Sequence, residues 1–367
     1  MAVDKGKIEE GRAKKSTGSK IAAILIRIIC AVLGLLIGAS LYFYFMLDDF
    51  HVDVPIVTED EYYSLDTTAE IERNGGDITS SWTDGGHTGV YVDPAHPIIK
   101  VNRINKNIEN ILVFGVDSRG TDEIQCRSDS MMVLSVNKKN GKIKLISLMR
   151  DTGVYIGDTH STASSSLDKL THAYFYGGVG LLINTINRNF GLDIQRFIMF
   201  DFNSAADFID LCGGVTIDVS ADEVKYANIN ITEQSNASGF EPPLLSSGGV
   251  QELSGVQAIG WARIRYLDSD FVRTSRQRRV AGALIENVND MSIIDKIGLL
   301  HDSAEVFETN MNANELIRLG FAVARGNGSM EEYRLPADNL YQVQQNPWMM
   351  IIDFDAQRAE LQNFIWG

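Results

Sequence analysis

The chain has 367 residues, 44% of them hydrophobic, which is enough for one large domain or two smaller ones with a buried core. Its formal net charge of −15 disfavours nonspecific binding to nucleic acid, because the phosphate backbone attracts positive surfaces. We therefore expect no nucleic acid among its partners.

The first 47 residues predict a cytosolic tail and a membrane anchor. Residues 1–20 are basic, and Ile21–Leu47 is an almost unbroken apolar run, longer than the roughly 20 residues that cross a bilayer. Because the basic flank precedes the run, the positive-inside rule places the N-terminus in the cytosol and everything after residue 48 outside the cell membrane. A signal peptide cleaved near Gly38-Ala39-Ser40 is the alternative, but the apolar run continues beyond that site.

After the anchor, the sequence predicts a linker and then the start of a sheet. Residues 48–107 are rich in Asp, Glu, Thr, Ser and Gly and lack sustained periodicity, which is typical of a linker or a small accessory segment. Short β-branched runs then predict buried strands at Ile111–Val116, Met131–Val136 and Ile143–Leu148. Asn140-Gly141 predicts a hairpin turn between the last two strands.

Charged side chains flank the ends of these three strands. They are Asp117, Arg119, Arg127, Asp129, Arg150 and Asp151. One Arg/Asp pair is ordinarily a surface salt bridge, but three pairs beside one sheet favour a site. Asp supplies the hard oxygen ligands that Mg²⁺ prefers, and the planar fork of Arg binds phosphate oxygens. The sequence therefore predicts a site for a metal-bridged phosphoryl group.

Beyond residue 151 the pattern alternates between helices and strands, which predicts an α/β sheet covered by helices on both faces. Leu167–Tyr176 predicts a short helix that Gly177-Gly178 ends, and Leu181–Phe190 predicts a second helix with Gly191 at its C-cap. Residues 221–250 contain few large apolar side chains and predict a long exposed loop. Near the C-terminus, a capping box between Asn312 and Glu315 predicts a helix that runs to Ala324.

A second group of charged residues lies in the stretch 262–279. Its members are Arg263, Arg265, Arg273, Arg276 and Gln277. The last three have i, i+3, i+4 spacing and share one helical face, whereas the first two share a side only in an extended segment. A solvated basic face and a second phosphate clamp both fit this pattern. Asp270, near the start of the helix, suits a dipole partner or an orienting carboxylate.

The chain resembles the LytR-CpsA-Psr family of cell-wall glycopolymer ligases in seven motifs that occur in the family's order. These are ILVFGVDSR, CRSDSMMVLSVN, ISLMRDT, KLTHAYFYGG, DFNSAADFIDLCGGV, ELSGVQAIGWARIR and RTSRQRR. The resemblance covers residues 108–290 and implies an α-β-α sandwich as catalytic domain, carried on a single membrane helix and facing the peptidoglycan. Residues 291–367 are then a C-terminal extension packed on this domain.

The resemblance also implies an activity. Such proteins are phosphotransferases that move a glycopolymer (teichoic acid, capsule or another secondary wall polymer) from undecaprenyl pyrophosphate to the muramic acid 6-hydroxyl of peptidoglycan, with Mg²⁺. Asp117 and Asp129 match the family's metal ligands. The positions that match its pyrophosphate contacts are Arg119, Arg127, Arg150, Arg263, Arg265, Arg273, Arg276 and Gln277.

The catalytic requirement of this reaction is charge neutralisation and positioning, which Arg150, Arg265 and Arg273 suit. A base must take the hydroxyl proton, and the sequence leaves Asp129 and Asp151 as equal candidates. Two rival functions stay open: a hydrolase that uses water in place of the muramyl hydroxyl, and a non-catalytic binding or regulatory protein of the envelope.

Three features of the sequence bear on the shape of this site. Met149 stands where the family usually has proline, and Thr171 stands where asparagine is common. Cys126 and Cys212 are the only thiols beyond the anchor, and a disulfide between them is possible outside the reducing cytosol.

Overall fold

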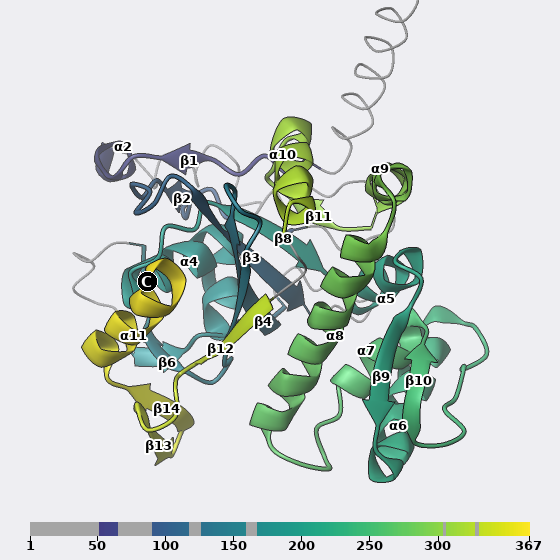
Figure 1. Cartoon of the computed structure of the whole chain (residues 1–367). Coiled ribbons are helices and arrows are strands. Elements are labelled where there is room, and N and C mark those ends of the chain that lie inside the picture. Colours follow the sequence, from purple (N-terminus) through teal and green to yellow (C-terminus); the bar gives the residue numbers. More distant parts are fainter. Residues whose placement is uncertain (1–50, 65–89, 117–125, 159–166, 304–305, 327–329) are drawn as a thin grey trace, which may run out of the picture. The chain divides into compact units, whose positions relative to one another are not determined.

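The structure is a computed structural model (Figure 1), and its described residues all belong to one of the two units into which the chain divides, residues 49–367. Asp117, Arg119 and the predicted anchor 21–47 lie outside the described residues. No helix within the described part is long and apolar enough to cross a membrane. The described stretches are 51–64, 90–116, 126–158, 167–303, 306–326 and 330–367.

A mixed six-stranded sheet forms the centre of the described fold (Figure 1). Its three central strands are antiparallel neighbours, as the predicted hairpin requires, and Gly141 has the left-handed φ of 72° that favours glycine. The three predicted strands are confirmed. From one edge to the other the strands are β11 (Glu308–Thr309), β8 (Arg196–Phe200), β3 (Ile108–Val116), β4 (Ser128–Asn137), β5 (Ile143–Leu148) and β12 (Met330–Leu335).

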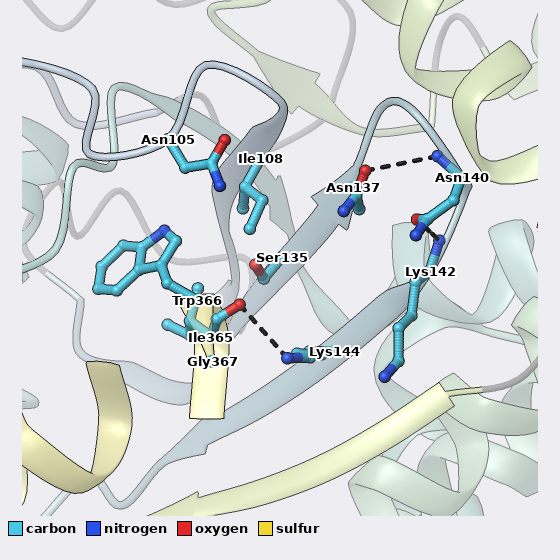
Figure 2. A pocket seen from close by; sticks show the side chains of 10 residues that line it. All are labelled: Asn105, Ile108, Ser135, Asn137, Asn140, Lys142, Lys144, Ile365, Trp366 and Gly367. Atoms are coloured by element: carbon cyan, nitrogen blue, oxygen red, sulfur yellow. Dashed lines mark hydrogen bonds between the residues drawn. The ribbon is translucent and has the colours of Figure 1, made fainter. Parts of the chain in front are cut away.

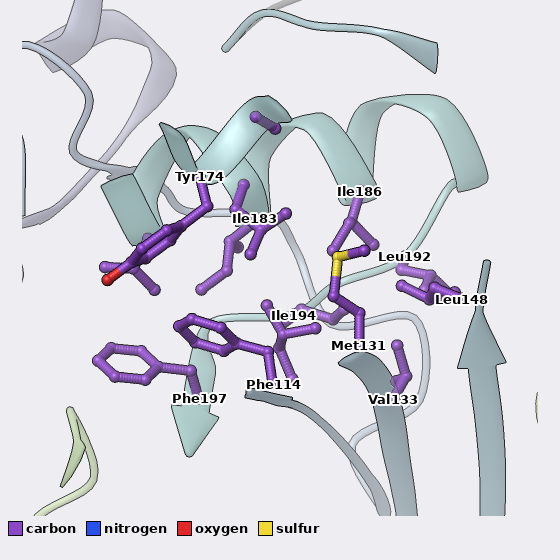
Figure 3. Packing of buried hydrophobic residues seen from close by; sticks show 14 of the residues in the cluster. Phe114, Met131, Val133, Leu148, Tyr174, Ile183, Ile186, Leu192, Ile194 and Phe197 are labelled. Atoms are coloured by element: carbon purple, nitrogen blue, oxygen red, sulfur yellow. The ribbon is translucent and has the colours of Figure 1, made fainter. Parts of the chain in front are cut away.

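The main hydrophobic core lies between the sheet and α4 (His172–Phe190), with α11 (Phe354–Trp366) packed beside α4. Ile183 and Ile186 of α4 lie over Phe114 and Met131 of the sheet (Figure 3). Complete burial of each such side chain contributes about 2 kcal/mol, so this layer is the principal source of the domain's stability.

The opposite face of the sheet is covered by α8 (Asp270–Asp290) and α10 (Ala313–Ala324). A guanidinium nitrogen of Arg278 on α8 lies 3.3 Å from the hydroxyl of Ser147, which alternates with the core residues of β5. Helices thus cover both faces, and the predicted α/β class with a helix-covered sheet is confirmed.

A second, smaller core involves α8 and the elements that precede it. Trp261 is completely buried in it, and Val280 of α8 packs into the same core. Because α8 contacts both the sheet and this core, it ties the two together. The other elements of the second core are α5 (Phe202–Leu211), β9 (Val215–Val219), α6 (Ala221–Ser238), β10 (Gly249–Leu253) and α7 (Gly255–Ala262).

The prediction of a loop over residues 221–250 was wrong for its first half, which is α6. Ser220 and Glu223 form a capping box at its start, and Gly239, with φ 78°, ends it. Only a narrow stripe that includes Ala227 and Ile231 is buried, so the helix needs few large apolar residues. The sequence feature that predicts this helix is therefore its capping residues and not its hydrophobic pattern.

The prediction that Gly177-Gly178 ends a first helix is confirmed, because both glycines have non-helical φ and ψ and α4 consists of two helices joined at this kink. The predicted start of that helix at Leu167 was wrong, since Leu167–Lys169 is the strand β7. The segment that includes His96 crosses the helix here: a Cβ atom on Gly180 would lie 1.7 Å from the carbonyl oxygen of His96. The glycines therefore permit close packing. The C-cap at Gly191, with φ 65°, is confirmed.

Residues 291–367 supply two strands of the central sheet, since β12 pairs with β5 and β11 pairs with β8. The capping box between Asn312 and Glu315 and the end of the helix at Ala324 are confirmed. The remaining elements are β1 (Ile56–Val57), α2 (Glu59–Ser64), β2 (Ile98–Ile99), β6 (Gly153–Tyr155), β7 (Leu167–Lys169), α9 (Ile293–Asp302), β13 (Tyr341–Gln345) and β14 (Trp348–Ile352).

The possible disulfide between Cys126 and Cys212 is not formed. Cys126 packs against the main core, whereas Cys212 is the C-cap residue of α5. Burial raises the pKa of the Cys212 thiol to about 12, which keeps it protonated and unreactive at neutral pH.

The capping box of α6 yields a test of this helix. Ser220→Ala removes the side-chain acceptor for the amide of Glu223, so the free energy of unfolding should fall by about 1 kcal/mol. Ser246→Ala, at an exposed loop position, is the matched control and should stay within about 0.5 kcal/mol of wild type. Urea denaturation followed by circular dichroism measures both, and equal stabilities of the two variants would contradict the cap.

Candidate functional site

The strand ends that carry the predicted charged residues meet at one edge of the sheet. Val116 at the end of β3 pairs with Ser128 at the start of β4, and Leu148 at the end of β5 pairs with Met131. The β3–β4 register shifts at this point, which leaves Asp129 as the extra residue of a β-bulge. Bulges redirect side chains and are frequent beside active sites.

Asp129 is shared by two arginines from distant parts of the chain. Nη1 of Arg150 lies 2.7 Å from its Oδ1, and Nη2 of Arg265 lies 2.8 Å from its Oδ2. Burial alone would raise the pKa of the Asp129 carboxyl, but the charges of both arginines outweigh burial and hold the pKa below its usual value. Asp129 is therefore ionised at neutral pH, and its ion pairs are lost only as the pH falls through this lowered value.

The start of α8 adds a third arginine and a second carboxylate. Nη2 of Arg273, a residue only 3% exposed, lies 2.7 Å from Oδ1 of Asp270, and Nε of Arg150 lies 4.0 Å from the same oxygen. Burial, opposed by Asp270 and reinforced by the charges of Arg150 and Arg265, lowers the pKa of Arg273 to about 10. The three guanidinium groups are thus close enough to repel one another.

Several buried polar atoms of this cluster have no hydrogen-bond partner. They are Nε of Arg150, Nε and Nη1 of Arg273, and Oδ2 of Asp270. Each such atom costs about 1 to 3 kcal/mol when it stays unpaired. Three cationic donors side by side suit the oxygens of a phosphate or diphosphate, which accept charge-assisted hydrogen bonds. The cluster is therefore a candidate site for an anionic ligand.

Asp151 lies on the other side of Arg150 and pairs with a lysine that the sequence analysis did not include. Its Oδ1 lies 2.7 Å from Nζ of Lys169, and its Oδ2 lies 3.4 Å from Nε of Arg150. Asp270 is the other residue of the cluster that the sequence analysis did not assign to the site, although its spacing of three residues from Arg273 predicted a contact on one helical face. The sequence holds no such signal for Lys169, because only the β6–β7 pairing brings this residue to the cluster.

The loop that carries Arg150 and Asp151 is fixed through its backbone. The amide of Thr171 donates to the carbonyl of Arg150 at 3.0 Å, and the amide of Met350 donates to the carbonyl of Asp151 at 3.0 Å. The start of α4 and the strand β14 therefore fix the backbone of both residues, which is what a preorganised site requires.

Two predicted arginines lie away from this cluster. Arg276 is 2% exposed, and it pairs with Asp268 and, through Nε at 2.7 Å, with Glu223. The guanidinium of Arg263 lies over the ring of Phe202, 4.0 Å from its centroid. Arg276 of α8 thus links this helix to α6 through Glu223.

The other predicted residues lie nearer the sheet edge or outside the described residues. Oε1 of Gln277 accepts from the hydroxyl of Ser130, beside the bulge, at 3.2 Å. Arg127 is exposed before the start of β4. Asp117 and Arg119 belong to the part of the chain that the structure does not describe.

Carboxylate oxygens at this edge are the donors that Mg²⁺ prefers. Among the described residues, however, no group of three or more His, Cys, Asp or Glu side chains is placed to hold a metal ion. Both oxygens of Asp129 accept from arginine. The described residues alone therefore do not complete a metal site.

A cavity of about 270 Å³ lies at the opposite end of β4, beside the β4–β5 turn and the end of α11 (Figure 2). Its charged and amide groups have structural partners: Nζ of Lys144 donates to the carbonyls of Phe364 and Ile365, and Oδ1 of Asn140 accepts from the amide of Lys142. Nε1 of Trp366 is the exception, since it has no hydrogen-bond partner within the described part of the chain. We therefore take the Arg–Asp cluster, and not this cavity, as the candidate functional site.

The model of the LytR_cpsA_psr family matches residues 81–363. The chain belongs to the LytR-CpsA-Psr family. The match includes β12 and α10 as well as the predicted domain, so the family's homologous region extends over most of the C-terminal residues. The resemblance in the seven motifs is thereby confirmed.

Individual relatives agree with this assignment. The polyisoprenyl-teichoic acid–peptidoglycan teichoic acid transferase TagV of Bacillus subtilis is 30% identical over 57% of this chain and 51% of its own. The transferase TagU of Bacillus mycoides, which bears the same functional name, is 27% identical over 74% of this chain and 86% of its own. The chain thus spans about half the length of TagV.

A solved structure of the LytR-CPS2A-psr family protein YwtF (TagT), with bound octaprenyl pyrophosphate lipid, has the same fold. Its TM-score is 0.53 at 21% identity, over 75% of this chain and 99% of that one. The likeness confirms the family fold for the described domain.

Arg276 and the arginines of the cluster should differ in how much they contribute to the stability of the fold. Arg276→Ala strands two buried or half-buried carboxylates, so the free energy of unfolding should fall by about 3 kcal/mol. Arg265→Ala removes a side chain that is 42% exposed and leaves Asp129 its pair with Arg150, so the loss should stay below about 1 kcal/mol. Chemical denaturation of both variants tests this, and the reverse order would refute the division.

Proposed function

We propose that this chain is a phosphotransferase that attaches an undecaprenyl-pyrophosphate-linked glycopolymer to the muramic acid 6-hydroxyl of peptidoglycan. The observation that carries the proposal is the set of unpaired, buried donors on Arg150 and Arg273 beside the Asp129–Arg265 pair. Family membership supports it, as do the names of TagU and TagV and the pyrophosphate lipid bound to YwtF. These relatives favour teichoic acid as the polymer.

In this reaction the acceptor hydroxyl attacks the phosphorus on the glycan side of the diphosphate. A new P–O bond forms, the bond from that phosphorus to the bridging oxygen breaks, and undecaprenyl phosphate leaves. Arg150, Arg265 and Arg273 stabilise the negative charge that develops on the phosphoryl oxygens and on the leaving group. Because their donors are held in place before the substrate binds, little reorganisation is needed.

The hydroxyl proton must pass to a carboxylate, and Asp151 suits this role better than Asp129. Both oxygens of Asp129 accept from arginine, and its lowered pKa makes it a weak base. Asp151 has one oxygen on Lys169 and keeps the other at 3.4 Å from Arg150, beyond a good hydrogen bond. We therefore propose Asp151 as the base.

We also propose that Asp117 and Asp129 hold Mg²⁺. The ion supplies positive charge to the diphosphate oxygens. What supports Asp129 in this role is its ionised carboxylate at the bulge, and its oxygens are hard donors of the kind the ion prefers.

The membrane arrangement and division of the chain complete the proposal. Residues 1–20 form a cytosolic tail, 21–47 a transmembrane anchor and 48–107 a linker, followed by the extracellular catalytic domain 108–290 and the C-terminal residues 291–367. A single-pass anchor keeps the domain at the membrane that contains its lipid-linked donor.

The roles of the arginine cluster and of the metal are tested together in a transfer assay with a lipid-linked donor and peptidoglycan. Arg265→Lys keeps the charge but loses the planar fork, so kcat should fall about tenfold or more. Asp129→Ala should reduce kcat by about two orders of magnitude or more and weaken the binding of Mn²⁺, a spectroscopic substitute for Mg²⁺, in electron paramagnetic resonance titrations.

Arg278→Lys is the matched control, because Arg278 lies on the same helix as Arg273 but contacts Glu332 and Ser147. Its turnover should equal that of wild type. If Arg265→Lys turned over as fast as wild type at saturating Mg²⁺, the proposed contact of Arg265 with the phosphoryl oxygens would be contradicted. The product decides between transferase and hydrolase: polymer joined to peptidoglycan supports the proposal, whereas free polymer phosphate alone would replace it with hydrolysis.

The anchor has its own test in cells. The tagged full chain should stay with membranes after alkaline carbonate washing, because an apolar span of this length does not leave the bilayer. Protease added outside protoplasts should remove the domain beyond residue 48. Release of the chain into the medium would contradict the anchor.

A further inference from the structure

The hairpin β13–β14 borders the charged cluster on two sides. At one side, the amide of Met350 donates to the carbonyl of Asp151 at 3.0 Å. At the other, the ring of Tyr341 lies 5.9 Å from the ring of Phe271, which follows Asp270 in α8. The hairpin therefore has a fixed position beside both carboxylates.

Trp348 at the start of β14 is a partly exposed aromatic residue next to this cluster. It is 38% exposed, whereas Trp261 is completely buried and Trp366 is half-buried. Nζ of Lys169 lies 5.8 Å from the centre of its ring, and the same Nζ lies 2.7 Å from Oδ1 of Asp151. A single lysine thus connects the indole to the carboxylate that we propose as base.

We propose that Trp348 and Lys169 bind a pyranose ring of the acceptor glycan beside Asp151. An exposed indole face packs against the apolar C–H face of a sugar, and an ammonium–carboxylate pair hydrogen-bonds its hydroxyl groups. This inference rests on the proposed function and names the part of the chain that positions its second substrate.

The order of the groups favours the acceptor sugar over the sugar of the donor. From the arginine cluster outward lie Asp151, then Lys169, then Trp348. The transfer requires the same order: phosphorus at the arginines, the attacking hydroxyl at the base, and the ring that bears this hydroxyl beyond it. The charge of Lys169 is already balanced by Asp151, which suits a neutral, hydroxylated ligand better than a second anion.

Glycan binding is measured first, without the donor. Isothermal titration calorimetry uses the full chain in detergent and a soluble tetrasaccharide of alternating N-acetylglucosamine and N-acetylmuramic acid, with its lactyl carboxylates capped as amides so that the ligand is neutral. Trp348→Ala should weaken binding about tenfold, and Trp348→Phe should restore part of it because a smaller aromatic face remains. Phe321→Ala, at an exposed aromatic residue of α10, is the control and should bind as wild type does. Equal affinities of wild type and Trp348→Ala would overturn the proposal.

Transfer kinetics then separate the two substrates. Trp348→Ala should raise the KM for the glycan acceptor about tenfold while the KM for the lipid donor changes less than about twofold. A rise in donor KM of the same size would overturn the assignment to the acceptor. A wild-type chain that binds the tetrasaccharide at Trp348 but transfers no polymer would contradict the proposed function and still support the glycan subsite.

Discussion

Arg150, Arg265 and Arg273 repel one another, and the fold holds them together through two carboxylates. Asp129 on the sheet pairs with the first two, and Asp270 at the start of α8 pairs with the third. The Asp129–Arg265 pair also joins the sheet to the segment between α7 and α8. Partly buried ion pairs add little net stability, because desolvation of the charges offsets their attraction. A cluster with unpaired donors is therefore better explained by an anionic ligand than by stability.

The arginines of α8 also differ in the carboxylates with which they pair. Arg273 and Arg276 are three residues apart and share one helical face, as their spacing predicts. Their partners nevertheless differ: Arg273 pairs with Asp270 beside the cluster, whereas Arg276 pairs with Glu223 and Asp268. Sequence reasoning missed this division because it treated residues 221–250 as a loop. Without α6 there is no fixed position for Glu223, so nothing distinguishes the two arginines.

Local signals accounted for the rest of the predicted fold. Strands, the hairpin at Asn140-Gly141 and the caps at Gly191 and Asn312 depend on near neighbours, and the structure confirms each. That the charged ends of β3, β4 and β5 share one edge also follows from the hairpin topology, because antiparallel neighbours alternate in direction. The pairing of β12 with β5 depends on contacts across a long stretch of chain, and the bulge at Asp129 depends on the register of β3 against β4; neither has a signal in the sequence.

Two departures from the family's usual residues now have a physical explanation. Met149 replaces proline, and its amide donates to the carbonyl of Leu335 at 2.8 Å, a bond that proline lacks the hydrogen to form. The hydroxyl of Thr171, in place of asparagine, donates to the carbonyl of Ser128 at 2.8 Å, directly before the bulged Asp129. Met149 thus adds a bond that proline cannot form, and Thr171 uses its hydroxyl to fix the strand beside Asp129. Because Leu335 belongs to β12, the C-terminal strand β12 is part of what holds the charged edge of the sheet in place.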